Sequence, residues 1–231
     1  MNALAPVITV DGPSGVGKGT LCRWLAGRLG FHLLDSGALY RLTALAAQRR
    51  NLVLEDEAGV AALAAGLMVE FLAGAGGPPR ILLDGMEVGP DLRTETCGAA
   101  ASRVAALPTV RMALLQRQRD FRQSPGLIAD GRDMGTVVFP DAELKLFLTA
   151  SAEERTRRRH KQLSEQGVNA NLKNLADEIA ERDARDRQRA AAPLRPAADA
   201  EVLDTTHWSI AEVCEQALAL AAQRLGLPVN R

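Results

Sequence analysis

The sequence predicts an α/β protein with a five-stranded parallel sheet between helices. Three observations support this prediction. Short apolar runs alternate with segments of helical periodicity, which is the pattern of successive strand–helix–strand units. Most of the runs are continuously apolar, as expected for strands that are covered on both faces. A glycine-rich segment follows the first run and precedes a helical segment, as in many α/β folds that bind anions.

Five apolar runs are predicted as strands, and helices are predicted between them. The strands are expected at PVITV (6–10), FHLL (31–34), GLIAD (126–130), ELKLFLT (143–149) and AEVLD (200–204). The helices are expected at 18–29, 37–50, 109–123, 152–166, 171–190 and 209–225. The Ala-rich stretches AALAAG and GAAASRVAAL are interpreted as tightly packed helices rather than as low-complexity linkers.

One region, residues 63–92, interrupts this alternation. It contains LMVEFL, then the Gly/Pro stretch GAGGPP, then ILLDGMEVG. The pair Asp84-Gly85 stands between residues typical of strands, and this is a strong signal for a hairpin turn. We therefore expect a small antiparallel sheet inserted into the α/β core.

Composition excludes several classes of function. The 231 residues are 47 % hydrophobic and 24 % charged, enough for one large domain with a real core. The formal net charge is zero, so the composition does not indicate nonspecific electrostatic binding to nucleic acid. Aromatic residues are only 3 %, which does not indicate a surface that stacks on bases. We expect no nucleic-acid partner.

Cysteine usage and the N-terminus favour a cytoplasmic protein. Cys22, Cys97 and Cys214 are far apart and odd in number, so they indicate neither a metal site nor a disulfide framework. The N-terminus reads as a strand without a basic leader, which argues against a signal peptide. No apolar run reaches the length of about 18 residues that a membrane span requires.

The segment GPSGVGKGT (residues 12–20, the glycine-rich loop) matches the pattern G-x-x-x-x-G-K. Glycines let the backbone N–H groups turn onto phosphate oxygens, and the following helix adds its positive N-terminal end. A glycine turn with a surface lysine is the alternative. The residues expected to bind ATP are Gly12, Pro13, Ser14, Gly15, Val16, Gly17, Lys18, Gly19 and Thr20.

Gly19 stands where most such loops have a serine or threonine that ligates magnesium, and Thr20 follows one position later. A magnesium ligand at the usual place is therefore not guaranteed, and Thr20 is only a candidate. Glycine followed by threonine resembles the loop of nucleoside monophosphate kinases. Signalling GTPases and most motor ATPases keep the hydroxyl one residue earlier.

Two further segments carry polar side chains at the ends of predicted strands, where open α/β sheets bind their ligands. In LLDSGALYR (33–41), Asp35 or Ser36 can cap the next helix, and Ser36, Tyr40 and Arg41 suit a phosphate monoester. Ser36 as a simple cap and Arg41 as a solvated residue are the alternatives.

In ADGRDMGTVVFPDA (129–142), three charges occur in four residues: Asp130, Arg132 and Asp133. They indicate either a ligand site or a structural salt bridge.

Two charged helical segments are ambiguous on their own. In AERDARDRQRAAAP (180–193), Arg182, Asp186 and Arg189 fall at i, i+4 and i+7, on one helix face. Such a run usually forms a solvated ladder of ion pairs. The cluster TRRRH (156–160) is likewise a surface face by default.

Taken together, these pieces resemble the bacterial type of cytidylate kinase over nearly the whole chain. The matching segments, in order, are ITVDGPSGVGKGT, HLLDSGALYR, LPTVR, PGLIADGRDMGTVVFPDA, ERTRRR, EIAERDARDRQRAAAPLRPAADA and VLDTT. The resemblance implies one P-loop kinase domain with an inserted antiparallel nucleotide-binding subdomain and a mobile helical lid. The core would comprise 1–62 and 108–231, with the lid at about 152–190 and the insert at 63–107.

The resemblance also implies roles for individual residues. The acceptor phosphate would be held by Ser36, Arg41, Arg132 and Arg189. The cytosine would be read by Ser102, Arg111 and Asp133. The ribose hydroxyls would be held by Arg182 and Asp186. The lid residues that close on ATP would be Arg155, Arg158 and Arg159. The groups that would act on the transferring phosphoryl group are Lys18, Arg132, Arg158, Arg189 and Asp130, the last through magnesium and its water or by orienting arginines.

Simple chemistry agrees with a cytosine-reading role for Asp133. Cytosine presents an amino donor where uracil has a carbonyl, and a carboxylate accepts from that amino group. Arg111 can donate to the ring acceptors. A site that loses a buried polar contact discriminates strongly, so we expect uracil to be a poor base for the acceptor.

The resulting hypothesis is transfer of the ATP γ-phosphoryl group to CMP or dCMP with Mg²⁺, by a monomer whose partners are these small molecules. A kinase for UMP/CMP, AMP or shikimate would need other base-reading residues. An ATP-dependent switch or nucleic-acid NTPase would be expected to have a hydroxyl at position 19. A non-catalytic module is disfavoured by Lys18 and the arginines. Asp35 and Tyr40 receive no role.

Overall fold

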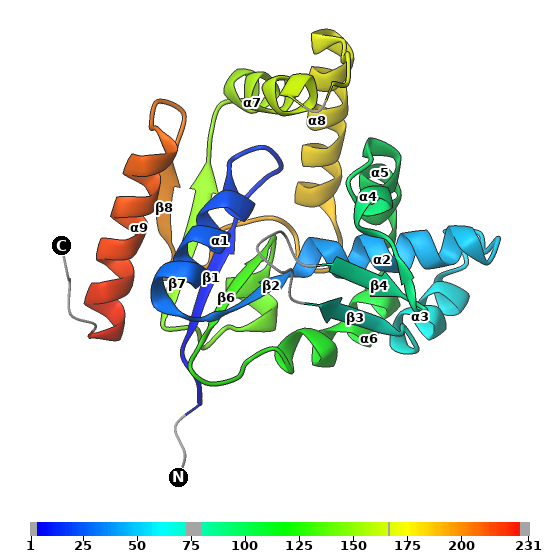
Figure 1. Ribbon diagram of the computed structural model, residues 1–231, viewed down its shortest axis with the longest axis horizontal. Helices are drawn as coiled ribbons and strands as arrows, with labels where there is room; N and C mark the ends of the chain where they lie inside the picture. Colours follow the sequence, from blue (N-terminus) through cyan, green and yellow to red (C-terminus); the bar gives the residue numbers. More distant parts are fainter. Residues whose placement is uncertain (1–3, 73–79, 166, 227–231) are drawn as a thin grey trace. The chain divides into compact units, whose positions relative to one another are not determined.

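The computed structural model describes residues 4–72, 80–165 and 167–226. The chain divides into two compact units, each of which is treated by itself. The core unit comprises Met1–Asp35 and Gln118–Arg231, and the middle unit comprises Ser36–Arg117. Figure 1 labels most of the helices and strands of both units.

The core unit is built on a parallel sheet that has, among the described residues, five strands in the order β2-β6-β1-β7-β8. The strands are β1 (Val7–Asp11), β2 (His32–Asp35), β6 (Leu127–Gly131), β7 (Leu144–Thr149) and β8 (Glu201–Asp204). Each one overlaps a predicted apolar run, so the predicted fold class is confirmed. The central strand β1 is buried along its whole length, as its continuous apolar run predicts.

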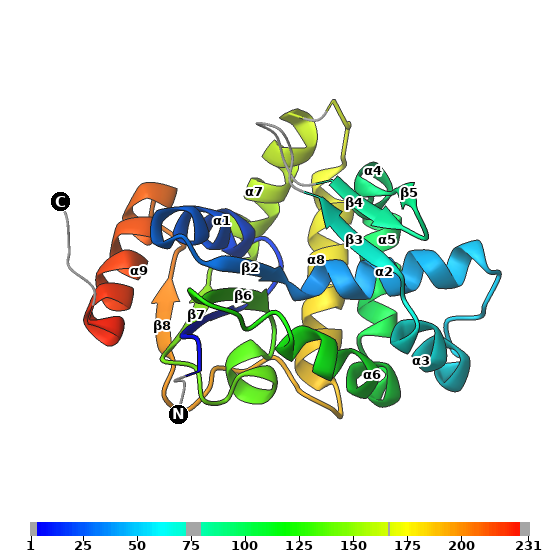
Figure 2. The same ribbon diagram turned by 60° about the horizontal axis from the view of Figure 1, so that its bottom comes forward.

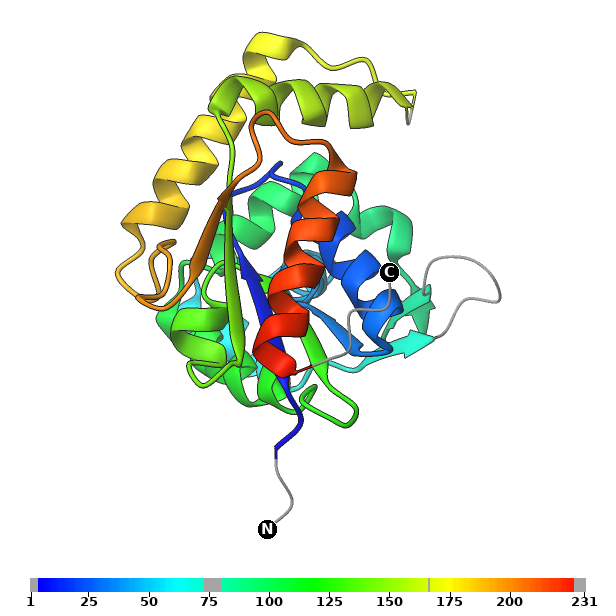
Figure 3. The same ribbon diagram turned by 90° about the vertical axis from the view of Figure 1, so that its left-hand side faces the viewer.

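The core unit also contains helices. They are α1 (Lys18–Leu29), the short π-helix η1 (Met134–Val138), α7 (Ala152–Glu165), α8 (Leu172–Gln188) and α9 (Ile210–Leu225). Helices α1 and α9 lie side by side, blue and red in Figure 3, and bury an apolar cluster with the sheet. Helices α7 and α8 contact each other through Leu163, Leu175 and Ile179. Helix α6 (Pro108–Arg119) contains the boundary between the units.

Two predicted helix ends are wrong. Helix α6 ends at Arg119 rather than at 123, because single hydrogen-bonded turns replace the helix there. Helix α8 ends at Gln188, and Arg189 follows with extended geometry (φ −55°, ψ 132°). Arg189 therefore does not continue the helix face that carries Arg182 and Asp186, contrary to the periodicity of the sequence.

The middle unit combines helices with a small antiparallel sheet (Figure 2). Its elements are α2 (Ser36–Arg49), α3 (Glu57–Ala65), β3 (Val69–Leu72), β4 (Arg80–Leu83), β5 (Met86–Glu87), α4 (Gly89–Leu92) and α5 (Glu95–Val104). The predicted hairpin is confirmed: Leu83 pairs with Met86, and Asp84 and Gly85 have φ of 51° and 78°. The stretch GAGGPP (74–79) lies outside the described residues.

Small residues let α5 pack closely on α2. A Cβ atom at Gly98 would lie 3.0 Å from the guanidinium of Arg41. The two Ala-rich stretches fall largely within α3 and α5, so their interpretation as packed helices is confirmed. Within the described ranges, no helix is both long and apolar enough to cross a bilayer.

Candidate active site

The glycine-rich loop joins β1 to α1 at the carboxyl edge of the sheet. Its glycines Gly12, Gly15 and Gly17 have φ angles of 147°, 81° and 94°, which residues with a side chain rarely adopt. A Cβ atom at Gly12 would collide with the carbonyl oxygen of Leu148 on β7. Since α1 begins directly after Gly17, the N–H groups of its first turn face the loop. The loop can therefore present backbone donors to an anion, as its pattern predicts.

Lys18 is held inside this loop. Its Nζ donates to the carbonyl oxygen of Pro13 at 2.8 Å, and the residue is only 7 % exposed. Burial, with a smaller contribution from Arg132, lowers the pKa of Lys18 to about 8, while Asp130 opposes the shift. The ammonium group thus stays charged near neutral pH and lacks full solvation, which favours an anionic ligand.

Asp130 lies beside Lys18 at the end of β6. Burial raises the pKa of Asp130 to about 6, Lys18 opposes this shift, and Asp35 adds to it. Asp35 is the register partner of Asp130 on β2, so both carboxylates lie on the same face of the sheet. A Cβ atom at Gly19 would lie 3.5 Å from Oδ2 of Asp130. The position at which most such loops carry a hydroxyl side chain is therefore next to the carboxylate of Asp130.

Arg132 follows β6 and is oriented by α8. Its Nε lies 2.9 Å from Oδ2 of Asp186, and its Nη1 donates to the carbonyl oxygen of Gly131 at 3.2 Å. Burial alone would raise the pKa of Asp186, but Arg132 holds it below its ordinary value. The predicted ribose ligand Asp186 and the predicted phosphate ligand Arg132 thus form an ion pair with each other.

Asp11 is a polar residue that the sequence analysis missed. Its two carboxylate oxygens accept hydrogen bonds from the backbone N–H groups of Met134 and Gly135, both at 2.8 Å. Burial raises the pKa of Asp11 to about 7, although these two donors lower it. The signal was present in the sequence: an acidic residue ends an otherwise apolar central strand, directly before Gly12.

Arg155 of the predicted lid is buried. Its guanidinium forms two hydrogen bonds with Asp183 of α8, at 3.1 and 2.6 Å. It also donates to the carbonyl oxygen of Ser14 in the glycine-rich loop at 3.2 Å. Asp183 was not predicted, because its partner is 28 residues away. Arg155 therefore connects α7, α8 and the loop.

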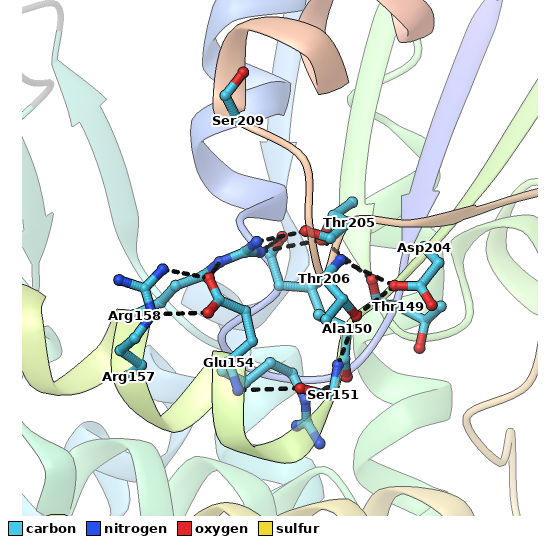
Figure 4. A network of polar contacts seen from close by, with 12 residues as sticks. Thr149, Ala150, Ser151, Glu154, Arg157, Arg158, Asp204, Thr205, Thr206 and Ser209 are labelled. Atoms are coloured by element: carbon cyan, nitrogen blue, oxygen red, sulfur yellow. Dashed lines mark hydrogen bonds and ion pairs between the residues drawn. The ribbon is translucent and has the colours of Figure 1, made fainter.

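Arg158, on the next turn of α7, belongs to the polar network in Figure 4. Its Nε lies 2.7 Å from Oε1 of Glu154, and its guanidinium donates to both oxygens of Thr205 after β8. It also donates to the carbonyl oxygen of Val16 at 3.4 Å. Arg159 donates instead to Gln162 on the same helix at 2.7 Å. Arg155 and Arg158 thus contact the loop, and Arg159 has a hydrogen bond within α7.

Four further predicted residues of the core unit lie on or near these elements. Asp133 is buried directly before η1. Arg182 lies on α8 near enough to Lys18 for its charge to lower the pKa of that residue. Arg189 donates to the carbonyl oxygen of Ala192 at 2.8 Å. Thr20 is exposed on the first turn of α1.

The middle unit carries the other predicted residues. Ser36 is buried at the start of α2. Arg41 donates to the carbonyl oxygens of Leu92 and Thr94 at 2.6 and 3.2 Å. These bonds fix its guanidinium against α4 and α5.

Arg111 and Ser102 are buried in the middle unit. Arg111 donates to the carbonyl oxygen of Ala105 at 3.1 Å, and its guanidinium carbon lies 5.6 Å from the ring centroid of Tyr40. Among the described residues, the buried hydroxyl of Ser102 has no hydrogen-bond partner. A buried polar group of this kind calls for an explanation, and a ligand atom is one.

Comparison with known proteins gives a consistent match. Residues 8–223 match the sequence model of the family described as "Cytidylate kinase". A protein named cytidylate kinase from Aeromonas hydrophila subsp. hydrophila is 58 % identical over 226 residues, which covers 98 % of each chain. One of the same name from Yersinia pestis is 57 % identical over 231 residues and covers both chains fully.

Solved structures give a weaker match. The crystal structure of TT1252 from Thermus thermophilus is 19 % identical, with a TM-score of 0.49, over 96 % of this chain and 99 % of that one. A shikimate kinase from Bacteroides thetaiotaomicron has a TM-score of 0.46 at 13 % identity, over 97 % and 100 % of the two chains. These scores are too low to bear on function.

Proposed function

Because the chain belongs to the cytidylate kinase family, we propose that it transfers the γ-phosphoryl group of ATP to the phosphate of CMP or dCMP, giving ADP and CDP or dCDP. The observation that carries the proposal is the grouping of Lys18, Asp130 and Arg132 beside a glycine-rich loop of the required geometry. The acceptor phosphate is already ionised, so the reaction needs alignment and charge stabilisation rather than a base.

On the donor side, we propose that the loop amides and Lys18 bind the ATP phosphates. Lys18 would exchange its bond to Pro13 for phosphate oxygens, which offer a stronger, charge-assisted bond. Arg155 and Arg158 already contact the carbonyl groups of Ser14 and Val16 in this loop. They can therefore follow the loop when a phosphate enters it, and Arg159 would act from the same helix.

On the acceptor side, each residue keeps the role that the resemblance implies. Arg132, Arg189, Ser36 and Arg41 would bind the phosphate of CMP. Asp133, Ser102 and Arg111 would bind cytosine. Arg182 and Asp186 would bind the ribose. The orphaned hydroxyl of Ser102 supports its role, since a buried donor of this kind gains a partner when the base binds.

The chain also offers groups that fit magnesium. Asp130 and its register partner Asp35 supply the oxygen ligands that Mg²⁺ prefers, next to the glycine that replaces the usual hydroxyl. We propose that Asp130 holds the ion, directly or through water, with Asp35 and Thr20 as further candidates. Bound with ATP, Mg²⁺ would neutralise charge on the phosphates.

The same proposal covers the larger organisation of the chain. Residues 63–107 would form the nucleotide-binding insert of the core formed by 1–62 and 108–231. Helices α7 and α8 would supply the lid at about 152–190, whose closure excludes water and so suppresses idle ATP hydrolysis. We further propose a cytoplasmic monomer that uses small molecules alone as partners.

The test is ADP release in a coupled assay with Mg-ATP and each of CMP, dCMP, UMP, AMP and GMP. Wild type and Asp133→Ala are compared. CMP and dCMP should exceed the other acceptors by about 100-fold or more in kcat/KM, and the variant should lose that margin. Equal use of UMP or AMP would contradict the acceptor assignment. ATP hydrolysis that does not depend on any acceptor would contradict the kinase proposal altogether.

A further inference from the structure

The carboxylate of Asp11 connects two segments of the core unit that are distant in sequence. Asp11 ends β1, and Gly12 of the glycine-rich loop is the next residue. Its Oδ1 accepts from the N–H of Met134 and its Oδ2 from the N–H of Gly135, 123 and 124 residues away. Both bonds are 2.8 Å long and buried.

These bonds act on the segment that carries Arg132 and Asp133. On one side of this pair, Gly131 is the register partner of Asp11 in the sheet. On the other side, Met134 and Gly135 are bonded to the Asp11 carboxylate. Arg132 and Asp133 are therefore fixed at both ends to one residue of β1.

Close packing supports this connection. A Cβ atom at Gly135 would lie 2.9 Å from Oγ1 of Thr9 and 3.1 Å from Cδ of Lys145, so the segment lies directly on the sheet. Asp133 itself makes a turn (φ −147°, ψ 23°), and its carbonyl oxygen accepts from Val137 and Val138 of η1. The Asp11 carboxylate accepts from both N–H groups at the start of η1 and so joins this segment to β1.

We propose that Asp11 is a positioning residue for the acceptor: its two hydrogen bonds set Asp133 and Arg132 in place relative to the loop that holds ATP. The proposal rests on the proposed function, in which Asp133 reads the base and Arg132 binds the acceptor phosphate. Asp11 touches neither nucleotide. It acts through the backbone, and its replacement should change acceptor recognition more than ATP binding.

The first variant is Asp11→Asn, which keeps one acceptor oxygen and loses the other. The expected result is a rise in KM for CMP of about tenfold and a fall in the preference for CMP over UMP of about tenfold, with KM for ATP changed less than about twofold. Thermal unfolding of each variant, without ligand, reports any general loss of stability.

The matched control is Glu143→Gln. The carboxylate of Glu143 also accepts a hydrogen bond from a backbone N–H group, that of Val7, at 2.7 Å. This bond lies at the opposite end of β1 from Asp11. This variant should keep both KM values and the base preference of the wild type. If it reproduces the Asp11→Asn pattern, the effect is a general one of weakening β1, and the proposal is wrong.

A second variant disturbs the same contact from the other side. Gly135→Ala places a methyl group against Thr9 and should displace the segment from Asp11 while leaving the carboxylate intact. It should give the same selective rise in KM for CMP. Normal KM for CMP and normal base preference in Gly135→Ala would overturn the proposal, even where Asp11→Asn fails to fold.

The outcomes separate this proposal from the proposed function. A wild-type protein without CMP-dependent ADP release refutes the function, whatever the variants do. A wild-type CMP kinase whose Asp11→Asn variant keeps its KM for CMP and its base preference refutes only the positioning role. An equal rise in KM for CMP and ATP also refutes it, because a disturbed glycine-rich loop would then explain the result.

Discussion

The two units hold their candidate phosphate-binding arginines in different ways. In the core unit, Arg132 is paired with the carboxylate of Asp186, whose side chain is only 6 % exposed. In the middle unit, Arg41 donates to two backbone carbonyl groups, of Leu92 and Thr94. Both arginines are oriented, but a carboxylate cancels the charge of the residue it orients, whereas a carbonyl group does not.

This difference separates orientation from charge. A guanidinium has five N–H donors, so Arg132 can keep its bond to Asp186 and still offer other donors to a phosphate. The net charge of the Arg132–Asp186 pair is small, so the pair attracts an anion only weakly at long range. Arg41 contributes long-range attraction as well as hydrogen bonds. We infer that Arg132 contributes mostly to geometry during transfer and that Arg41 contributes mostly to binding of the acceptor.

The largest effect is expected for Arg132→Met. Loss of a positioned guanidinium from phosphoryl transfer should lower kcat by about 1,000-fold. It should also destabilise the protein by about 3 kcal/mol, because the buried carboxylate of Asp186 loses its ion-pair partner. Steady-state kinetics and denaturant unfolding measure the two effects.

A double variant separates these two effects. In Arg132→Met with Asp186→Asn, the buried charge is gone, so stability should return towards the wild-type value while kcat stays low. Recovery of kcat together with stability would show that Arg132 is only structural and would remove the distinction between the two arginines.

A smaller effect is expected for Arg41→Met. Loss of one charge-assisted contact to phosphate should raise KM for CMP by about 30-fold, with kcat lowered less than about fivefold. Because Arg41 keeps its charge, part of its contribution is screened by salt. The wild-type KM for CMP should therefore rise between low and high ionic strength more than that of the variant. Equal salt dependence would contradict the difference inferred between the arginines.

Ser102→Ala tests whether the middle unit is built for a ligand rather than for stability. Removing a buried hydroxyl without a partner should raise the free energy of unfolding by about 1 kcal/mol. The same change should raise KM for CMP by about tenfold if cytosine supplies the missing partner. A variant that is less stable, or that binds CMP normally, would contradict this role. Ser151→Ala is the control that should lose stability, because the hydroxyl of Ser151 accepts from the backbone N–H of Glu154 in the first turn of α7.

Local patterns predicted much of this fold. The five strands, the Asp84-Gly85 hairpin and the glycine-rich loop each depend on residues within a few positions of one another, so their patterns are visible in the sequence. The family resemblance placed Lys18 and Arg132, and the structure brings them close enough that Arg132 contributes to lowering the pKa of Lys18.

Pairing between distant residues was not predictable in the same way. Asp11 and Arg155 bond to residues that lie 123 and 28 positions away in the sequence. Only the folded chain brings these residues together, so a sequence pattern with a short period does not indicate them. Arg189 leaves α8 although the charge pattern continues, because the N–H of Leu194 turns back onto the carbonyl oxygen of Asp186. Local helical periodicity could not show that turn.

The smallest predicted effect on stability is that of Glu154. This residue forms an ion pair with Arg158 on α7. Hydrogen bonds from Arg157 and then Arg158 lower the pKa of Glu154 to about 2 from its ordinary 4.5. Because the folded pKa is depressed, the stabilisation is present above pH 4.5 and is lost as the pH falls through 2. These side chains are partly exposed, so solvent screens their charges. The contribution of Glu154 to the free energy of unfolding is therefore limited to about 1 kcal/mol, or about 2–4 °C in Tm.

Glu154→Gln should therefore melt about 2–4 °C below the wild type at pH 7 and at the same temperature as the wild type near pH 2. Glu165→Gln is the control on the same helix, because its exposed pair with Lys161 is 3.9 Å long and should contribute almost nothing. A Tm difference that stays constant across this pH range would mean that Glu154 stabilises α7 by packing. Arg158 would then be positioned by the oxygens of Thr205 and Val16 without a carboxylate, as Arg41 is by its two carbonyl groups.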